Sequence, residues 1–113
     1  MKIIRVTDQE YGHFLGQEVA TENVKYYRVL SDKGLTVGRF VLDKIYSIRM
    51  VVDLVLTVEL TERIWRLICK KIRKTFYITL SKYRTDYIKF LRSHGVVEED
   101  LEIKKRVVFK QLQ

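Results

Sequence analysis

Apolar and polar residues alternate through much of the chain, and this alternation predicts its strands. The longest alternating run spans residues 47–60 and predicts one central strand with a wholly apolar face. That face carries Ile48, Met50, Val52, Leu54, Leu56, Val58 and Leu60. Shorter strands are predicted at residues 2–6, 24–31, 35–43 and 76–80, with a closing hairpin over residues 96–112. A hairpin turn is predicted at residues 32–34, where Gly34 takes the positive φ angle.

Three other segments have the spacing of amphipathic helices. The first begins at Thr7, which forms a capping box with Glu10 three residues later. Its apolar positions are Tyr11, Phe14, Leu15 and Val19. The second spans residues 61–74 and the third spans residues 85–95. Their inward-facing residues are Ile64, Trp65, Ile68 and Ile72 in the second helix, and Tyr87, Ile88 and Leu91 in the third.

The end of the third helix is marked by Gly95, which lets the helix stop abruptly. We expect the chain to re-enter the sheet there, beside the strand that begins at Phe76. The predicted order of elements is β-α-β-β-β-α-β-α-β-β. This order predicts an α+β fold with a mixed, mostly antiparallel central sheet flanked by about three helices.

The length of 113 residues predicts a single domain over residues 1–113. Cys69 is the only cysteine, and His13 and His94 are the only histidines. An intramolecular disulfide or a Cys/His metal cage is therefore excluded, and no metal is expected. No apolar run is long enough to span a membrane, and the opening residues lack the apolar core of a signal peptide. We therefore expect a protein that is not secreted by that route.

The positive charge is concentrated in one third of the chain. The formal net charge is +8, and residues 61–92 hold ten Lys and Arg against only Glu62 and Asp86. The ten are Arg63, Arg66, Lys70, Lys71, Arg73, Lys74, Lys82, Arg84, Lys89 and Arg92. This basic block could hold the phosphates of a ligand or of nucleic acid, or it could be a solvated helix face. Too few aromatic residues, such as Tyr83 and Tyr87, are interleaved with it to predict a base-stacking platform.

The order of elements resembles the GCN5-related N-acetyltransferase (GNAT) fold over essentially the whole chain. The resemblance is carried by "IIRVTDQEYGHFL", by the long strand "MVVDLVLTVEL" that leads into a helix, and by "IKFLRSHGVVEED", which resembles the closing motif of the family. More narrowly, "IWRL" and "TDYIKFLRSHGVV" resemble small GNAT-like proteins of short-tailed bacteriophages, some of which travel inside the virion. The resemblance implies an acetyl-CoA site between the long strand and the following helix. Its candidate residues are Thr61, Arg63, Ile64, Trp65 and Arg66.

Two motifs that the active family uses are missing. The loop that cradles the cofactor pyrophosphate carries glycines, but residues 57–66 contain none, and Glu59 and Glu62 add negative charge there. The family's tyrosine acid, which protonates the departing thiolate, aligns with Leu91. Tyr87, one turn earlier, could substitute, although its apolar helix face favours a core position.

Other side chains have both a functional and a structural interpretation. Glu59 and Asp53 could act as a general base or could solvate a strand face, which we favour. Cys69 is expected to be a small packing residue. His94 is placed to cap helix carbonyls. Trp65 is expected to pack against the sheet, whereas exposure would indicate a partner surface.

Three functions remain open. The preferred hypothesis is a catalytically degenerate GNAT-like phage protein that binds virion or host proteins, inside the virion or in the host cytoplasm, with no cofactor. The alternatives are an active acyl-CoA-dependent N-acetyltransferase, which would use acetyl-CoA, and a nucleic-acid-binding accessory protein that binds DNA through the basic helices. A homo-oligomer could also form through an open sheet edge, such as the strand Val107 to Leu112.

Overall fold

The computed structural model describes residues 1–11, 24–45 and 47–113. The strands are β1 (Lys2–Val6), β2 (Val24–Leu30), β3 (Thr36–Ile45), β4 (Ile48–Leu56), β5 (Phe76–Ser81), β6 (Val97–Ile103) and β7 (Arg106–Gln111). The helices are α1 (Asp8–Tyr11), α2 (Glu62–Ile72) and α3 (Thr85–Ser93). The predicted order of strands and helices is confirmed. Phe14, Leu15, Val19 and His13 lie outside the described residues.

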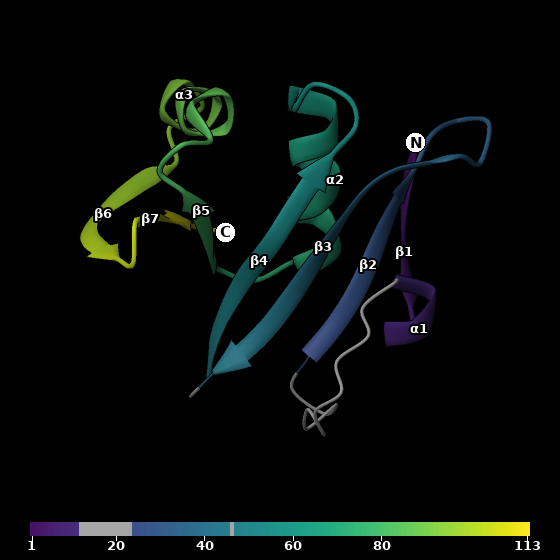
Figure 1. The fold of residues 1–113 in the computed structure, drawn as a ribbon, viewed down its shortest axis with the longest axis horizontal. Coiled ribbons are helices and arrows are strands. Elements are labelled where there is room, and N and C mark those ends of the chain that lie inside the picture. Colours follow the sequence, from purple (N-terminus) through teal and green to yellow (C-terminus); the bar gives the residue numbers. More distant parts are fainter. Residues whose placement is uncertain (12–23, 46) are drawn as a thin grey trace.

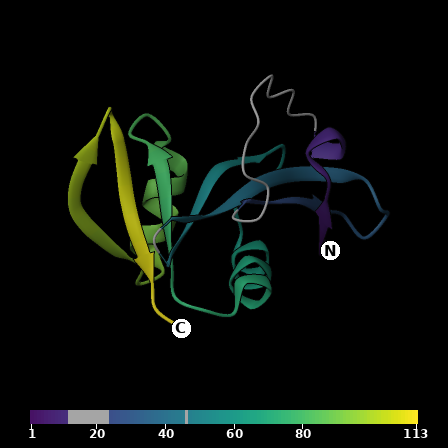
Figure 2. The ribbon, with the colours of Figure 1, turned by 90° about the horizontal axis from the view of Figure 1, so that it is seen from below.

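The described strands form one seven-stranded sheet in the order β1-β2-β3-β4-β5-β7-β6 (Figure 1). Neighbours pair antiparallel except β4 and β5, which are parallel. Figure 2 shows α1 and α2 on opposite sides of strands β1–β4. The main core includes side chains of the sheet, α2 and α3, and a smaller cluster of Tyr11, Tyr26 and Val41 lies beneath α1. The predicted α+β fold with a mostly antiparallel sheet is confirmed.

Local signals in the sequence set the boundaries of several elements. The Thr7 hydroxyl accepts a hydrogen bond from the Glu10 amide at 3.2 Å, which is one half of the capping box. Thr61 caps α2 in the same way, accepting from the Ile64 amide at 3.4 Å. Gly34 has a φ angle of +78°, as the predicted turn required.

The C-terminus of α3 is also formed as predicted. Gly95 has a φ angle of +70°, and the Val96 amide donates back to the Leu91 carbonyl at 3.2 Å. The Nδ1 atom of His94 lies 2.8 Å from the Phe90 carbonyl, so this histidine caps the helix. The chain then enters β6, which pairs with β7 at the edge of the described sheet. The expectation that it would run beside β5 was wrong, because β7 occupies that position.

The central strand departs from its prediction at a bulge. It ends at Leu56, and its pairing with β3 shifts between Arg39↔Val55 and Val41↔Val52. Two residues of β4 therefore face one residue of β3, and Asp53 takes a φ angle of +55°. The extra residue changes which side chains face the core, so Val51 before the bulge and Leu54 after it are both buried in the main core. The single apolar face predicted for residues 47–60 was wrong before the bulge.

The strand proposed as an open edge is internal. β7 (Arg106–Gln111) pairs with β5 on one side and with β6 on the other. The edges of the described sheet are β1 and β6. The pairing of β6 with β7 is irregular between Glu99 and Glu102, which makes this edge a poor template for another strand.

Candidate functional site

The candidate site is the opening between the two parallel strands at the centre of the sheet. β4 and β5 pair at Met50↔Tyr77 and Val51↔Ile78, and beyond these pairs the two strands diverge (Figure 1). The bulge at Asp53 lies two residues after Val51, which forms the last pair. A pocket of about 630 Å³ lies at the opening. This volume is typical of sites that hold small molecules.

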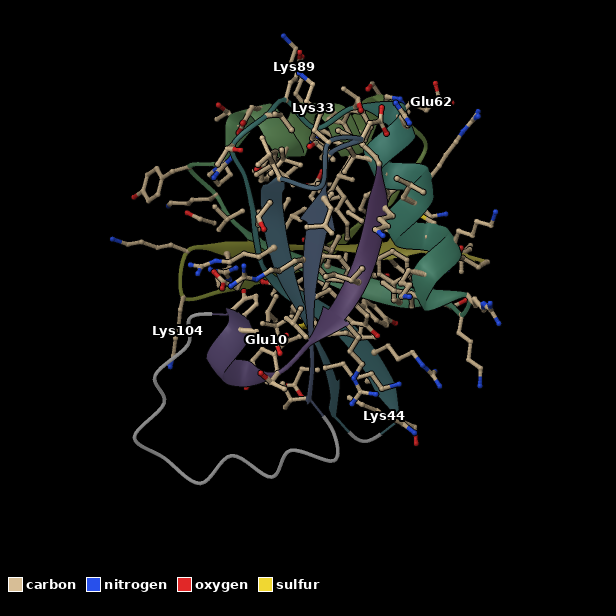
Figure 3. The ribbon with its side chains drawn as sticks, turned by 90° about the vertical axis from the view of Figure 1, so that its right-hand side faces the viewer. Glu10, Lys33, Lys44, Glu62, Lys89 and Lys104 are labelled. Atoms are coloured by element: carbon tan, nitrogen blue, oxygen red, sulfur yellow. The ribbon has the colours of Figure 1, made fainter. Side chains whose placement is uncertain are left out.

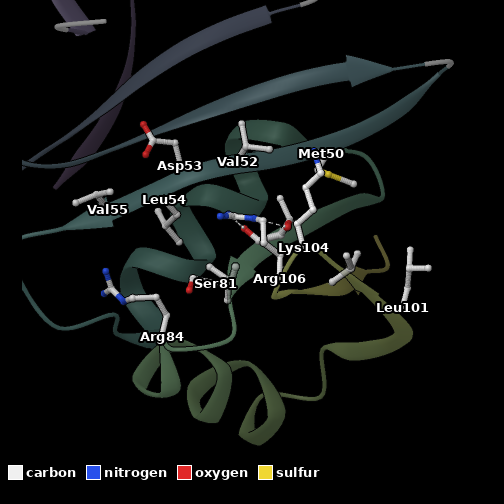
Figure 4. Close-up of a pocket in the computed structure, with 13 residues that line it drawn as sticks. Met50, Val52, Asp53, Leu54, Val55, Ser81, Arg84, Leu101, Lys104 and Arg106 are labelled. Atoms are coloured by element: carbon white, nitrogen blue, oxygen red, sulfur yellow. Dashed lines mark hydrogen bonds between the residues drawn. The ribbon is translucent and has the colours of Figure 1, made fainter.

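The pocket combines apolar walls with charged groups around them (Figure 4). Its apolar lining includes Met50, Val52, Leu54, Leu101 and Val108, and its charged residues are Asp53, Arg84, Lys104 and Arg106. The guanidinium of Arg106 donates to the hydroxyl of Thr79 at 3.0 Å and to its carbonyl at 3.1 Å. Arg84 is held by Asp86, with their closest atoms 3.3 Å apart. The basic groups outnumber the single carboxylate.

Asp53 belongs to a cluster of polar side chains at the bulge. The Tyr11 hydroxyl donates a hydrogen bond to its carboxylate, and Arg39 Nε lies 3.9 Å from Oδ2. The Arg39 guanidinium also lies over the Tyr11 ring, 5.0 Å from its centroid. The carboxylate is therefore engaged by a phenol and a guanidinium. Sequence reasoning named Asp53, but it missed Tyr11 and Arg39 because they are brought together only by the packing of α1 and β3 against β4.

The Tyr11 phenol is expected to ionise late. Burial of the ring, and then the hydrogen bond to Asp53, raise the pKa of Tyr11 above its ordinary value. Folding raises this pKa, so the protonated phenol stabilises the folded state. This contribution to stability is fully present below a pH of ~10, the pKa of tyrosine in the unfolded chain. It is lost as the pH rises through the pKa of Tyr11 in the folded state. In an alkaline absorbance titration, Tyr11→Phe should remove a late-titrating phenol. An unchanged late phase would contradict this assignment.

Tyr87 joins α3 to the end of β4 through a hydrogen bond. Only 2% of this residue is exposed, and its hydroxyl accepts a hydrogen bond from the Leu56 amide at 3.0 Å. The Arg84 guanidinium stacks on its ring, 3.9 Å from the centroid. Neither Tyr87 nor Leu56 lines the pocket. The tyrosine considered as a substitute acid is thus a buried core residue.

The connection from β4 to α2 is short, and backbone amides in it and in the first turn of α2 donate hydrogen bonds within the chain. The Thr57 amide donates to the Val37 carbonyl at 2.8 Å, and Leu60 is buried. The Ile64 amide donates to the Thr61 hydroxyl, and the Trp65 backbone amide donates to the Thr61 carbonyl at 3.0 Å. Glu59, the other candidate base, is exposed in this connection and does not line the pocket.

The five residues proposed to hold a cofactor have different environments. Ile64 and Trp65 lie in the core, where Trp65 packs 5.7 Å from Phe76 between ring centroids, as expected for a structural tryptophan. Their side chains cannot reach a ligand at the surface. Arg63 pairs with Asp32 at 3.3 Å, and Arg66 pairs with Glu62 at 2.5 Å. A surface groove of about 500 Å³ is lined by Glu62, Arg63, Arg66, Leu67 and Lys70.

The ten residues of the basic block come from two parts of the fold. Six lie on α2 or just after it, and four lie on the β5–α3 connection or on α3. Arg92 is paired with Glu98 at 2.9 Å, a contact that raises the pKa of Arg92 and lowers the pKa of Glu98. The structure adds Lys104 and Lys105 to the β5–α3 group, because the Lys82 amide donates to the Lys105 carbonyl at 2.9 Å. The sequence could not show this contact between distant segments.

The remaining candidates have structural environments. Cys69 is half-buried, and burial raises the pKa of its thiol to about 11, which keeps it protonated and weakly nucleophilic. Within residues 1–11, 24–45 and 47–113, His, Cys, Asp and Glu form no group of three or more that could hold a metal ion. No helix in the same residues has the length and apolar character needed to cross a membrane.

Comparison with known proteins identifies the fold. No family model and no curated protein sequence matches the chain. Among solved structures, a candidate acyl-CoA N-acyltransferase from Klebsiella pneumoniae has a TM-score of 0.71 at 11% identity, over 97% of this chain and 95% of that one. A candidate GNAT-family acetyltransferase from Bacteroides thetaiotaomicron has a TM-score of 0.70 at 10% identity, over 100% and 88%.

A third similar structure was solved with a ligand. The N-acetyltransferase PseH of Campylobacter jejuni, in complex with acetyl coenzyme A, has a TM-score of 0.64 at 14% identity, over 99% of this chain and 98% of that one. At such low identity these likenesses define a shared fold and do not transfer an activity. The chain therefore has the GNAT fold expected from its order of elements.

Proposed function

We propose that this chain uses the GNAT fold as a binding scaffold and does not transfer acyl groups. The observation that carries the proposal is the hydrogen bond between the Tyr87 hydroxyl and the Leu56 amide. By the resemblance to the family, we expect a cofactor to pass at this place.

The path of a cofactor follows from the resemblance to the family. The family holds the pyrophosphate between the long strand and the next helix, and its tyrosine acid lies on the later helix. In this chain those two places are the β4–α2 connection and the position of Leu91 on α3. A ligand joining them must pass between the end of β4 and α3. The buried Tyr87 side chain occupies this space and uses the Leu56 amide.

The two ends of that path also lack suitable chemistry. Leu91 is fully buried and has no proton to donate. The β4–α2 connection has no glycine, so its backbone cannot approach a pyrophosphate as closely as a glycine loop does. Thr61 already uses the Ile64 amide, and Glu62 adds a carboxylate in the first turn of α2.

The proposal extends to the setting in which the protein acts. Residues 64–67 and 85–97 resemble small GNAT-like proteins of short-tailed bacteriophages, and this resemblance supports a virion or host-cell accessory protein. On this proposal the partners are virion or host proteins, or nucleic acid, and no cofactor is required.

An active acyl-CoA N-acyltransferase is the second candidate. It is favoured by the pocket at the β4–β5 opening, where Asp53 could accept a proton from an amine. The first candidate is preferred because Tyr87, the tyrosine on α3, is buried and does not line this pocket.

Calorimetric titration with acetyl-CoA separates the two candidates. We expect no binding heat at millimolar ligand, because the path past Leu56 is closed. The matched variant Arg66→Glu/Lys70→Glu removes basic groups from the α2 groove and should behave like the wild type. Micromolar binding by the wild type that is lost in this variant would establish a working cofactor site and overturn the proposal.

A further inference from the structure

The turn between β6 and β7 has an unusual backbone for its sequence. Ile103 pairs with Arg106, so the hairpin loop consists of Lys104 and Lys105 alone. Both lysines have positive φ angles, +51° and +62°. Such turns strongly prefer Asn-Gly, because glycine has no Cβ atom and the short polar side chain of Asn tolerates this region better than a long side chain does. Strain of this kind is common where a side chain is needed for function.

This turn lies against the connection between β5 and α3. The Lys82 amide donates to the Lys105 carbonyl at 2.9 Å, which joins the two segments directly. Within the connection, the Tyr83 amide donates to the Ser81 hydroxyl at 3.3 Å, and the Arg84 amide donates to the Ser81 carbonyl at 2.9 Å. The bond between the two segments places the backbone of Lys82 beside that of Lys105, and Lys104 precedes Lys105 in the turn and also lines the pocket. We call the group formed by Lys82, Tyr83, Lys104 and Lys105 the loop–turn surface.

The loop–turn surface also presents an aromatic ring to solvent. Tyr83 is 68% exposed, and the Lys82 ammonium lies 5.6 Å from its ring centroid. An exposed tyrosine among lysines has the two elements that hold single-stranded nucleic acid, a ring for base stacking and cations for phosphates. Lys104 and Lys105 are both exposed, and neither has an ion-pair partner in the described part of the chain.

The α2 face is a weaker candidate for the same partner. Its two arginines nearest the helix N-terminus are paired with Asp32 and Glu62. Figure 3 shows Glu62 on α2 and Lys104 on opposite sides of the molecule in that view, so the two basic regions are separate.

We propose that the loop–turn surface binds single-stranded nucleic acid, with Lys104 and Lys105 neutralising phosphates and Tyr83 stacking on a base. This inference rests on the proposed binding function and names its partner. It predicts binding without strong sequence preference, because phosphate contacts and stacking read no base edges.

The test is fluorescence anisotropy with a labelled oligothymidylate. The informative variant is Lys104→Asn/Lys105→Gly, because it removes two charges and gives the turn the residues it prefers. We expect this variant to unfold at a higher temperature than the wild type and to bind about tenfold more weakly at low salt. Its higher stability rules out misfolding as the reason for weaker binding. Tyr83→Ala should also weaken binding by about tenfold.

The matched control removes two charges elsewhere. Lys70→Gln/Lys71→Gln lies on the exposed face of α2 and should retain nearly wild-type binding. The magnitude of the salt slope should fall by about 1.4 in the turn variant, from two lost phosphate contacts on a single strand. Wild-type binding by the turn variant, equal loss in the α2 control, salt-independent binding, or no binding by the wild type would each overturn the inference. Tighter binding to duplex DNA with no effect of Tyr83→Ala would also overturn it.

The two proposals can fail separately. Acetyl-CoA binding would overturn the closed cofactor path and leave the nucleic-acid result unaffected. Absence of nucleic-acid binding would overturn the loop–turn surface and leave the closed cofactor path in place.

Discussion

Replacing Tyr87 with alanine is expected to lower the free energy of unfolding by about 3–5 kcal/mol, the range for removing a large buried aromatic ring. Tyr87 is 2% exposed and belongs to the main core. The loss combines the apolar contacts of the ring with the cavity that the truncation leaves. Urea unfolding, followed by circular dichroism, measures it directly.

The matched variant Tyr87→Phe isolates the hydroxyl. It keeps the ring in the core but leaves the Leu56 amide without its acceptor, and we expect a loss of about 1–2 kcal/mol. A phenylalanine variant as stable as the wild type would mean that the hydroxyl does not hold the end of β4 to α3.

Gly38→Ala is expected to lower the free energy of unfolding by about 2–3 kcal/mol, the upper part of the range for overpacking. A Cβ atom at this position would lie 2.3 Å from Leu56 Cδ2 and 2.9 Å from the Val55 carbonyl oxygen. The leucine tip can rotate away, but the carbonyl belongs to the backbone of β4. The close approach of β3 to β4 therefore requires glycine here. Urea unfolding of the variant and the wild type measures the loss.

Two controls separate the sources of this loss. Gly34→Ala meets no atom within 4 Å, and its positive φ angle alone should cost about 1 kcal/mol. A double-mutant cycle of Gly38→Ala with Leu56→Ala should recover only part of the loss, because the clash with the Val55 carbonyl remains. Full recovery would attribute the requirement for glycine to the leucine side chain alone.

The order of elements could be predicted from the sequence because each element has its own periodicity and its own end signals. Thr7, Thr61 and Gly95 act through hydrogen bonds and φ angles within a few residues, so a local pattern is enough to identify them. The buried positions of Trp65 and Tyr87 follow from the same helical spacing.

The bulge and the strand order could not be predicted in this way. Alternation continues without a break through residues 47–60, so nothing in the pattern marks Asp53 as the extra residue. The insertion of β7 between β5 and β6 depends on pairing between distant segments, which periodicity does not specify.

The candidate sites depend on the same non-local pairing. The Asp53 cluster joins α1, β3 and β4, and the loop–turn surface joins the β5–α3 connection to the β6–β7 turn. Charge counting by segment assigned Lys82 and Arg84 to the same basic block as α2. In the structure, the Lys82 amide instead donates to the Lys105 carbonyl. Two lysines that are far apart in the sequence therefore lie next to each other.

We have proposed that Tyr87 closes the cofactor path at the Leu56 amide. This proposal is tested by following the backbone amide resonance of Leu56 by ¹H–¹⁵N NMR while acetyl-CoA is added. We expect no change at this resonance, or at those of Thr61 and Ile64, up to millimolar ligand. A saturable shift of the Leu56 resonance with micromolar affinity would show that the cofactor binds at this amide, and would refute the proposal.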